Sequence, residues 1–316
     1  MRSAANNPPG QKRPPFCICR SVKISLFYNK AAGDGISLGE LQERLKRAGY
    51  DVVRSLGRDD DTSALAEQPS KLVVAAGGDG TIAAAAKAVA GSNIPLAILP
   101  LGTANNIAKS LGINGALPEL IESWRHAIPV PFDLGEASAN GQTFAFVEGI
   151  GGGLIPSGIS AADEAGDEDD ETATEVRVAD AICHFRDVLI GLKPTRFTLK
   201  ADGADMSGDY LVVEVLNIGC VGPNIEFSPG VTPSDGLLSV VTAGEEYRDE
   251  LLSYLDERMA GKTGHLSLPA TLATNVEIGG RGNIHLDDRN RKAKALGNLS
   301  LRIQPAALSV LNSPAT

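Results

Sequence analysis

A strand followed by a glycine-rich turn and a helix-forming stretch occurs twice in succession in this chain, and this pattern most constrains its fold. In the first copy the apolar run Leu72–Ala76 leads into the turn Gly77–Thr81. In the second copy the run Leu96–Leu99 leads into the turn Pro100–Asn106. Glycine lets a backbone approach an anion closely, and the N–H groups that open the next helix attract the same anion. The pattern therefore predicts an α/β fold with a phosphate-binding pocket.

Asp79, inside the first turn, indicates more than a simple phosphate pocket. Because a carboxylate repels a bare phosphate, its expected partner is a metal ion, a ribose hydroxyl or the hydroxyl of an acceptor. The turn is therefore typical of a site for chemistry on a nucleotide. The sequence contains no Walker lysine motif, which excludes a P-loop enzyme.

Length and charge exclude several classes of protein. The 316 residues allow one large domain or two moderate ones, and the formal net charge of −10 argues against a nucleic-acid partner. It also disfavours electrostatic adhesion to anionic membranes, although transient membrane contact through an apolar patch is still allowed. The four cysteines lack the spacing of a metal site, and no apolar stretch reaches the ~20 residues that span a bilayer. We therefore expect a cytoplasmic protein with reduced thiols; the sequence leaves open whether it forms a homo-oligomer.

The composition changes along the chain and predicts separate regions. Residues 1–20 are rich in Asn, Pro, Gly and basic side chains, which predicts a disordered tail. Strands alternating with helices over residues 21–131 predict a parallel sheet that is doubly wound, with helices on both faces. The expected elements there are the strands Val22–Tyr28, Leu72–Ala76 and Leu96–Leu99, and helices after Ser37, over Thr62–Glu67, over Ile82–Ala90 and through Ile107.

From residue 132 to 304 the sequence predicts a second, mainly antiparallel β domain. Its short β-like segments are separated by Gly, Pro, Asn and Asp, and include Thr143–Val147, Arg196–Lys200, Tyr210–Val215, Leu237–Val241, Asn275–Ile278 and Ser300–Ile303. Residues 176–192 could be helical. The acidic stretch 163–175 is interpreted as a solvated loop, because nothing fixes its carboxylates in one metal-binding geometry.

The motifs resemble a known family. Gly77–Thr81 together with Pro100–Asn106 resembles the catalytic domain of the diacylglycerol kinase and sphingosine kinase family of lipid kinases, in particular its soluble bacterial branch. Asn29–Gly33 resembles the opening nucleotide loop of that family, and Val231–Leu238 resembles its acidic Asp-Gly turn. The resemblance extends from about Val22 to Pro314.

The resemblance implies a two-lobed kinase that phosphorylates a hydroxyl of a lipid or lipid-like acceptor. The family has an α/β lobe, an antiparallel β-sandwich lobe and a cleft between them that holds ATP. Its last strand returns from the second lobe to the first. The resemblance therefore places residues 305–316 in the α/β lobe, with the strand itself over Ala307–Leu311.

The resemblance also implies roles for individual residues. The nucleotide would contact Asn29, Lys30, Ala31, Ala32, Gly33, Gly77, Gly78, Asp79, Gly80, Thr81, Gly102, Thr103 and Asn105. Asp235 would hold a structural Mg²⁺, helped by oxygens of Thr232 and Leu237, since Mg²⁺ prefers oxygen ligands. Taken alone, Asp235-Gly236 is only a favoured turn pair, and Asn105 and Asn106 are only suited to start a helix.

The sequence departs from the family at the expected general base. The family has a glutamate in an Asp-Gly-Glu turn, whereas the matching stretch here is Leu286-Asp287-Asp288-Arg289. Arginine cannot take up a proton at physiological pH. Asp287 or Asp288 is then a candidate substitute, which makes Asp79, Asp287 and Asp288 the candidate catalytic residues. The family glycine matches Asp288, and an aspartate there could keep the turn from the positive φ that glycine adopts.

Two alternative functions remain at this point. NAD kinase shares the Gly-Gly-Asp-Gly turn, although the Pro100–Asn106 loop favours the lipid-kinase branch. Arg289 instead suggests a nucleotide-binding protein of this fold with little or no kinase turnover. Lys30, where the family usually has proline, is either a phosphate partner or an exposed loop lysine.

Overall fold

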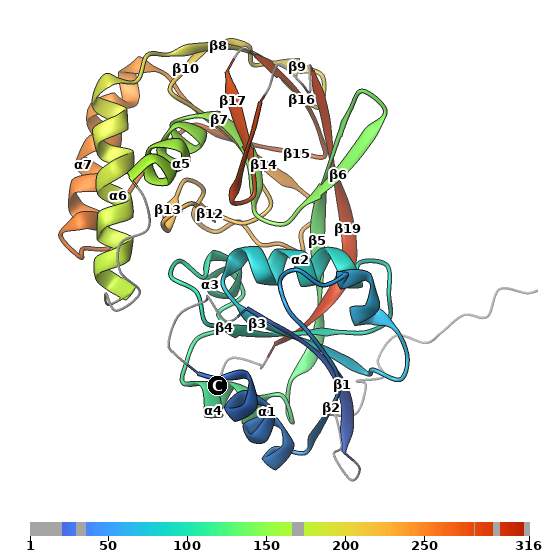
Figure 1. Ribbon diagram of the computed structural model, residues 1–316. Helices are drawn as coiled ribbons and strands as arrows, with labels where there is room; N and C mark the ends of the chain where they lie inside the picture. Colours follow the sequence, from blue (N-terminus) through green and yellow to red (C-terminus); the bar gives the residue numbers. More distant parts are fainter. Residues whose placement is uncertain (1–20, 30–35, 166–173, 281, 293–297, 313–316) are drawn as a thin grey trace, which may run out of the picture.

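The computed structural model describes residues 21–29, 36–165, 174–280, 282–292 and 298–312. Within these ranges the chain forms two lobes, one above the other (Figure 1). The predicted tail at 1–20, the loop residues 30–33 and most of the acidic stretch 163–175 lie outside the described residues.

The N-terminal lobe is built on a parallel sheet in the order β2-β1-β3-β4. Its strands are β1 (Val22–Tyr28), β2 (Tyr50–Leu56), β3 (Leu72–Gly77) and β4 (Leu96–Pro100). Every residue of β3 is buried, and successive side chains alternate between two hydrophobic clusters. A strand covered on both faces is the arrangement that the continuous apolar run predicted.

Helices cover both faces of this sheet, as predicted (Figure 1). They are α1 (Leu38–Arg47), the 3₁₀ helix η1 (Thr62–Ala66), α2 (Asp79–Val89), α3 (Asn106–Ser110) and α4 (Leu117–Ser123). Ser37 caps α1 by accepting the N–H of Glu40, which confirms the capping signal. The stretch predicted as a helix over Thr62–Glu67 is a short 3₁₀ turn, and α4 was not predicted.

The C-terminal lobe is an antiparallel β-sandwich. Its strands run from β5 to β18 in chain order: β5 (Ile128–Ala139), β6 (Gln142–Phe146), β7 (Gly149–Gly153), β8 (Thr195–Ala201), β9 (Ala204–Asp205), β10 (Gly208–Tyr210), β11 (Val212–Leu216), β12 (Cys220–Val221), β13 (Ile225–Glu226), β14 (Leu238–Ala243), β15 (Ala270–Ala273), β16 (Asn275–Gly280), β17 (Asn283–Leu286) and β18 (Arg289–Lys292). One sheet has the order β15-β14-β11-β7-β17-β18, and the other includes β10-β8-β16. Val213 and Val215 of β11 pack between the two sheets.

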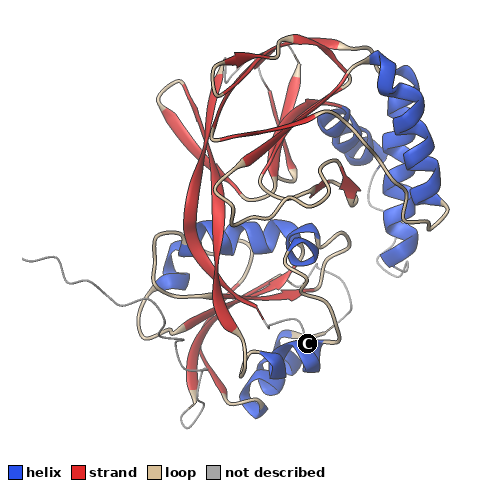
Figure 2. Ribbon diagram, turned by 180° about the vertical axis from the view of Figure 1, so that it is seen from behind, coloured by secondary structure: helices blue, strands red, loops and turns tan. Residues whose placement is uncertain are grey.

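A layer of helices covers the outer face of the sandwich (Figure 2). It contains α5 (Leu154–Ala165), α6 (Thr174–Gly191), the short turn η2 (Glu245–Tyr247) and α7 (Arg248–Met259). Val212 and Leu216, on the other face of β11, pack against this layer. The helix expected over 176–192 is confirmed, whereas α5 and α7 were not predicted.

The long strand β19 (Leu299–Asn312) joins the two lobes. Its first half pairs with β16, and its last residues pair with β4 in parallel through Val310 and Leu96. Along its length it also pairs with β5, with a register shift between Gln304 and Leu308. The expected return of the chain to the α/β lobe is therefore present, and the predicted fold class is confirmed.

Candidate active site at the junction of the lobes

The two glycine-rich turns lie against each other at the carboxyl end of the parallel sheet. A Cβ atom on Gly102 would overlap Cα of Gly78, and Leu101 N–H donates to Gly77 O at 3.0 Å. Asn29, which follows β1, donates its N–H to Ala76 O at 3.1 Å. The ends of β1, β3 and β4 thus meet at the point where the strand order reverses, between β1 and β3, which is where such sheets bind ligands.

Asp79 is held by the first turn of α3. Its Oδ1 accepts the N–H of Ile107 at 2.9 Å. Burial raises the pKa of Asp79 above its ordinary value, while the N–H groups of Ile107, Asn106 and Asn105 and the Lys109 ammonium oppose this rise. Asp79 therefore connects the two glycine turns, because it belongs to one and binds the helix that follows the other.

The side chains of Asn105 and Asn106, at the start of α3, bind groups outside that helix. Asn105 has a left-handed backbone with φ of 54°, and its side chain accepts from Gly102 N–H and donates to Gly102 O. Asn105 occupies the N-cap position of α3, but its side chain makes no capping hydrogen bond there, and Asp79 accepts Ile107 N–H instead. Asn106 is buried and donates from Nδ2 to Glu148 Oε2 at 3.2 Å and to Gly222 O at 2.9 Å.

Asp287 connects the second lobe to α2. Its carboxylate accepts from Val147 N–H and Glu148 N–H, both at 2.9 Å, and pairs with Lys87 Nζ at 2.6 Å. The Asp287 side chain is only 3 % exposed. Three donors already occupy this carboxylate, which favours a holding role over that of a proton acceptor.

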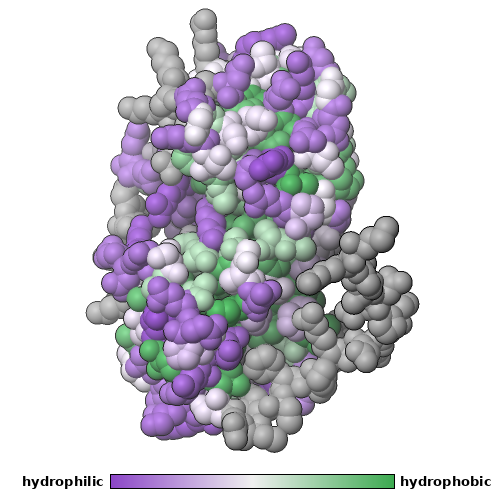
Figure 3. Space-filling model, turned by 90° about the vertical axis from the view of Figure 1, so that its right-hand side faces the viewer, coloured by the Kyte–Doolittle hydropathy of each residue, from purple (hydrophilic) through white to green (hydrophobic). Residues whose placement is uncertain are grey.

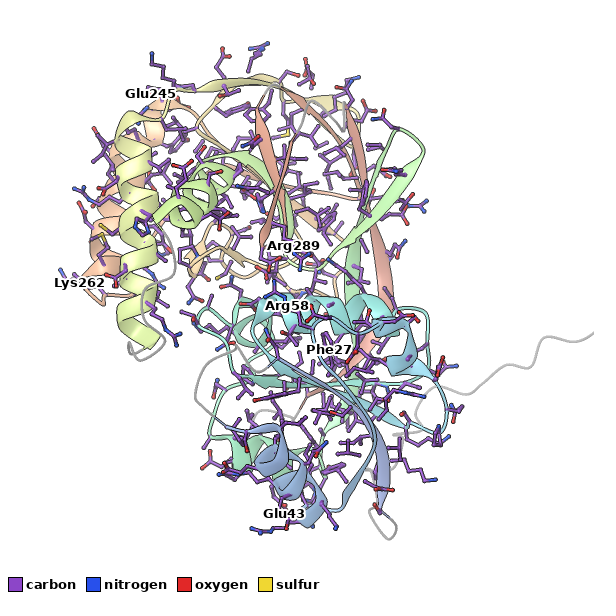
Figure 4. All side chains as sticks on the ribbon, viewed as in Figure 1. Phe27, Glu43, Arg58, Glu245, Lys262 and Arg289 are labelled. Carbon is purple, nitrogen blue, oxygen red and sulfur yellow. The ribbon has the colours of Figure 1, made fainter. Side chains whose placement is uncertain are left out.

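Asp288 follows in the turn between β17 and β18, and Arg289, the first residue of β18, lies on the side of the second lobe that faces the α/β lobe (Figure 4). A Cβ atom on Gly80 would lie 2.6 Å from Asp288 Oδ2, so this carboxylate lies directly over the first glycine turn. Arg289 Nε is 3.7 Å from Asp288 Oδ1, and both side chains are exposed. The left-handed residue of this turn is Asp287, with φ of 52°. Asp288 itself is not among the residues with a positive φ.

Glu148, between β6 and β7, is a further carboxylate at this junction that the sequence analysis missed. It is 3 % exposed. Burial raises its pKa well above the ordinary value, and the charges of Asp79, Asp287 and Asp288 add to this rise, while the hydrogen bond from Asn106 opposes it. A lone acid inside the apolar, glycine-rich run Phe146–Gly153 was the signal that could have identified it.

A buried acid–histidine pair lies beneath the β17–β18 turn. His285 Nε2 is 2.7 Å from Glu214 Oε2, and His285 Nδ1 donates to Asp287 O at 2.8 Å. Burial lowers the pKa of His285, but the Glu214 carboxylate and Asp287 together outweigh burial, and the net pKa is raised. Burial raises the pKa of Glu214. Both ring nitrogens of His285 are therefore occupied by contacts within the second lobe.

The Asp-Gly turn lies at the other side of the junction. Asp235 Oδ1 accepts Leu237 N–H at 2.9 Å, and Thr232 Oγ1 is 3.4 Å from its Oδ2. The buried Asp133, which the sequence analysis also missed, accepts Gly236 N–H at 2.8 Å and Ala306 N–H at 2.7 Å. Asp133 therefore fixes this turn against the crossover of β19.

The remaining predicted residues are placed as follows. Thr103 is partly buried in the second turn, whereas Thr81 is buried and packs against Gly77. Lys30, Ala31, Ala32 and Gly33 lie outside the described residues, so their assignment stays a prediction. Among the described residues, no group of three or more His, Cys, Asp or Glu side chains is arranged to hold a metal ion.

We predict that the protein is more stable at pH 6 than at pH 8. In the folded state the pKa of His285 is raised above its ordinary value of 6.5, and the pKa of Glu148 is raised well above its ordinary value of 4.5. Between their ordinary and raised pKa values these two residues bind more protons when folded, so the free energy of unfolding falls as pH rises. The pKa values of four other acids are lowered in the folded state, and these acids affect the free energy of unfolding only around pH 4 and below. They are Asp61, Asp202, Asp205 and Glu245.

Thermal unfolding at constant ionic strength tests this prediction. Tm should fall between pH 6 and pH 8, and Glu148→Gln should reduce that fall because it removes one of the titrating groups. A Tm that rises over this interval would contradict the assignment of the raised pKa values.

Comparison with family models gives two matches that together span most of the chain. Residues 23–137 match the diacylglycerol kinase catalytic domain. Residues 155–312 match the YegS C-terminal NAD kinase beta sandwich-like domain. The boundary between the two matches lies close to the boundary between the two lobes.

Full-length relatives carry related names. A protein of Mycobacterium tuberculosis (strain H37Rv) named "Diacylglycerol kinase" is 25% identical over 92% of this chain and 94% of its own length. The "Probable lipid kinase YegS" of Shigella flexneri serotype 5b is 30% identical over 73% of this chain and 77% of its own length.

Solved structures share the fold. A diacylglycerol kinase from Bacillus anthracis superposes with a TM-score of 0.68 at 18% identity, covering 94% of this chain and 99% of the other. An NAD kinase from Archaeoglobus fulgidus in complex with ATP gives a TM-score of 0.51 at 13% identity, covering 92% and 94%.

One face of the molecule shows how hydrophilic and hydrophobic residues are distributed over the two lobes. Figure 3 views the side of β5 and β19, where hydrophilic residues cover much of both lobes and paler, mildly hydrophobic residues lie where the lobes meet. None of the described helices is both long enough and apolar enough to cross a membrane.

Proposed function

The chain belongs to the bacterial diacylglycerol kinase and YegS lipid kinase family, and from this premise we propose that it transfers the γ-phosphoryl group of ATP to a hydroxyl of a lipid or lipid-like acceptor. One observation supports this most strongly. The two glycine turns pack backbone against backbone at Gly78 and Gly102, and Asp288 of the other lobe lies over Gly80. A phosphate cradle and a carboxylate from the opposite lobe are what phosphoryl transfer between two bound substrates requires.

Roles follow from this placement. The turns containing Gly77–Thr81 and Gly102–Asn105, together with Asn29, form the proposed nucleotide site, because their backbones meet without intervening side chains. Asp79 lies beside the phosphates, held in place by Ile107 N–H. Asp287 holds the β17–β18 turn on α2 through Lys87.

Magnesium fits the Asp-Gly turn by the chemistry of its donors. Asp235 offers an exposed carboxylate, and Thr232 and Leu237 lie beside it in the same turn. Mg²⁺ accepts one or two carboxylates and completes its shell with other oxygens and water. Bound there, the ion would hold the turn together and supply positive charge near the crossover of β19.

We predict that Asp235→Ala removes the thermal stabilisation given by Mg²⁺. An ion that binds only the folded state raises Tm by mass action, and the variant lacks the carboxylate that would hold it. The turn itself should survive, since Asp133 still accepts Gly236 N–H. Thermal unfolding with and without Mg²⁺ measures the effect.

The control for this prediction is Asp209→Ala, which removes another exposed carboxylate, one that lies 3.6 Å from Arg196 Nη1. This variant should retain the full Mg²⁺ effect. An Asp235→Ala variant that Mg²⁺ stabilises as much as the wild type would place the ion elsewhere.

A panel of acceptors tests the proposed function. Purified protein is incubated with radiolabelled ATP and Mg²⁺ together with diacylglycerol, a sphingoid base, NAD or no acceptor. Phosphorylated lipid is expected. Labelled NADP instead would favour NAD kinase activity, and ATP binding without transfer to any acceptor would favour a nucleotide-binding protein, as Arg289 suggested.

A further inference from the structure

Three hydrogen bonds fix the backbone of Glu148. Its N–H donates to Asp287 Oδ1 at 2.9 Å, and its carbonyl oxygen accepts from Asn217 N–H at 2.8 Å and Ile218 N–H at 3.3 Å. Asn106, from the α/β lobe, holds Oε2 at 3.2 Å. The side chain is therefore pre-positioned at the point where the two lobes meet.

Stability alone does not account for this glutamate. Within the described residues no cation contacts Glu148, since Lys87 binds Asp287 and Lys109 binds Asn224 Oδ1 at 2.8 Å. Burying an uncompensated acid costs free energy unless the group takes up a proton. A buried acid that lowers the stability of the protein, and that hydrogen bonds nevertheless hold in one position, is typical of a functional site.

Two oxygen atoms here lack a hydrogen-bond donor. Asn106 Oδ1 is buried without a partner, and Glu148 Oε1 has no hydrogen bond within the part of the chain that is described. Both atoms accept hydrogen bonds. A hydroxyl group of a bound alcohol supplies the donor that they lack.

The other carboxylates at the junction are less suited to accept a proton. Asp287 already accepts from three donors, and Asp79 accepts at the start of α3. Asp288 is exposed to solvent, and its carboxylate lies 3.7 Å from Arg289 Nε. Burial and three nearby carboxylates move the pKa of Glu148 upward, toward the range in which a general base is effective at neutral pH.

We propose that Glu148 is the proton acceptor for the hydroxyl group that is phosphorylated, in the place of the family glutamate that Arg289 replaces. This role rests on the proposed function. The acceptor oxygen forms a bond to the γ-phosphorus as the bond from that phosphorus to the β–γ bridging oxygen breaks. The hydroxyl proton moves to Glu148, and ADP leaves with the bridging oxygen.

The test compares Glu148→Gln, Glu148→Asp and the control Glu136→Gln. Glu136 is also largely buried, with its side chain 12 % exposed, but it pairs with Arg302 on the sheet of β5. For each protein we measure ATP·Mg²⁺ binding, Tm, and the rate of transfer to the best acceptor from pH 5 to pH 9. The charged or titratable groups around Glu148 are Asp79, Asp287, Asp288 and the Cys220 thiol, with Lys87 and Lys109 as the nearby cations.

Glu148→Gln should bind ATP normally and transfer phosphate about 10²–10⁴-fold more slowly. It should also lose the fall in rate that the wild type shows as pH decreases through the pKa of the base. Glu148→Asp should recover part of the rate, and Glu136→Gln should match the wild type.

Two outcomes would overturn the assignment, and they are distinguishable. If the wild type transfers phosphate and Glu148→Gln keeps both its rate and its pH profile, Glu148 is not the base although the kinase function stands. If the wild type binds ATP but phosphorylates no alcohol, the proposed function fails, and the role of Glu148 fails with it.

Discussion

Replacing Asp79 with asparagine is expected to slow phosphate transfer by about 10²–10⁴-fold and to leave the fold intact. Asparagine has the same shape and keeps an oxygen that can accept Ile107 N–H, so the link between the two glycine turns survives. What disappears is a negative charge in a site built for phosphate. That charge is useful only toward a cation or a proton.

We would measure the transfer rate, ATP binding and Tm of this variant. Together they separate a role of the Asp79 charge in phosphate transfer from a structural role of its hydrogen bond to Ile107. The matched control is Asp61→Asn, because Asp61 also accepts a backbone N–H at the start of a helix, from Ser63 at 2.9 Å. Asp61 caps η1, and its replacement should leave transfer unchanged. Activity of Asp79→Asn within a few-fold of the wild type would show that Asp79 is only a helix cap.

Replacing Asp287 with alanine is expected to lower the free energy of unfolding by about 2–5 kcal/mol. The change leaves the N–H groups of Val147 and Glu148 without an acceptor and leaves Lys87 without its partner. Alanine is also strained at φ of 52°. Because these contacts join the two lobes, the loss should also reduce activity.

Denaturant unfolding of three variants measures this effect. Asp287→Asn keeps an oxygen acceptor and tolerates the left-handed backbone, so it should lose less than the alanine variant. Asp187→Ala, whose side chain is 66 % exposed and lies 3.6 Å from Arg186, should change stability by no more than ~0.5 kcal/mol. If Asp287→Ala lowers the free energy of unfolding by less than ~1 kcal/mol, water must replace the carboxylate as the partner of the groups that it binds.

The sequence by itself determined the α/β lobe, because the signals that identify its strands, turns and helices are local. The apolar runs at β1, β3 and β4, the Ser37 cap and the glycine turns each identify an element from neighbouring residues alone. The order of strands and helices then leaves few topologies for a parallel sheet. In α7 a local signal existed, since Leu251, Tyr254 and Leu255 have helical spacing, but it was missed.

Only the tertiary structure decided which carboxylates meet at the junction of the lobes. Asp287 and Asp288 are neighbours in sequence, yet one is buried under three donors and the other lies exposed over Gly80. Glu148 is remote in sequence from both Asp79 and Asp287, and its burial follows from how β6, β7 and β17 pack on α2 and α3. A proton acceptor is defined by burial and neighbouring charge, and those properties arise only when distant segments come together.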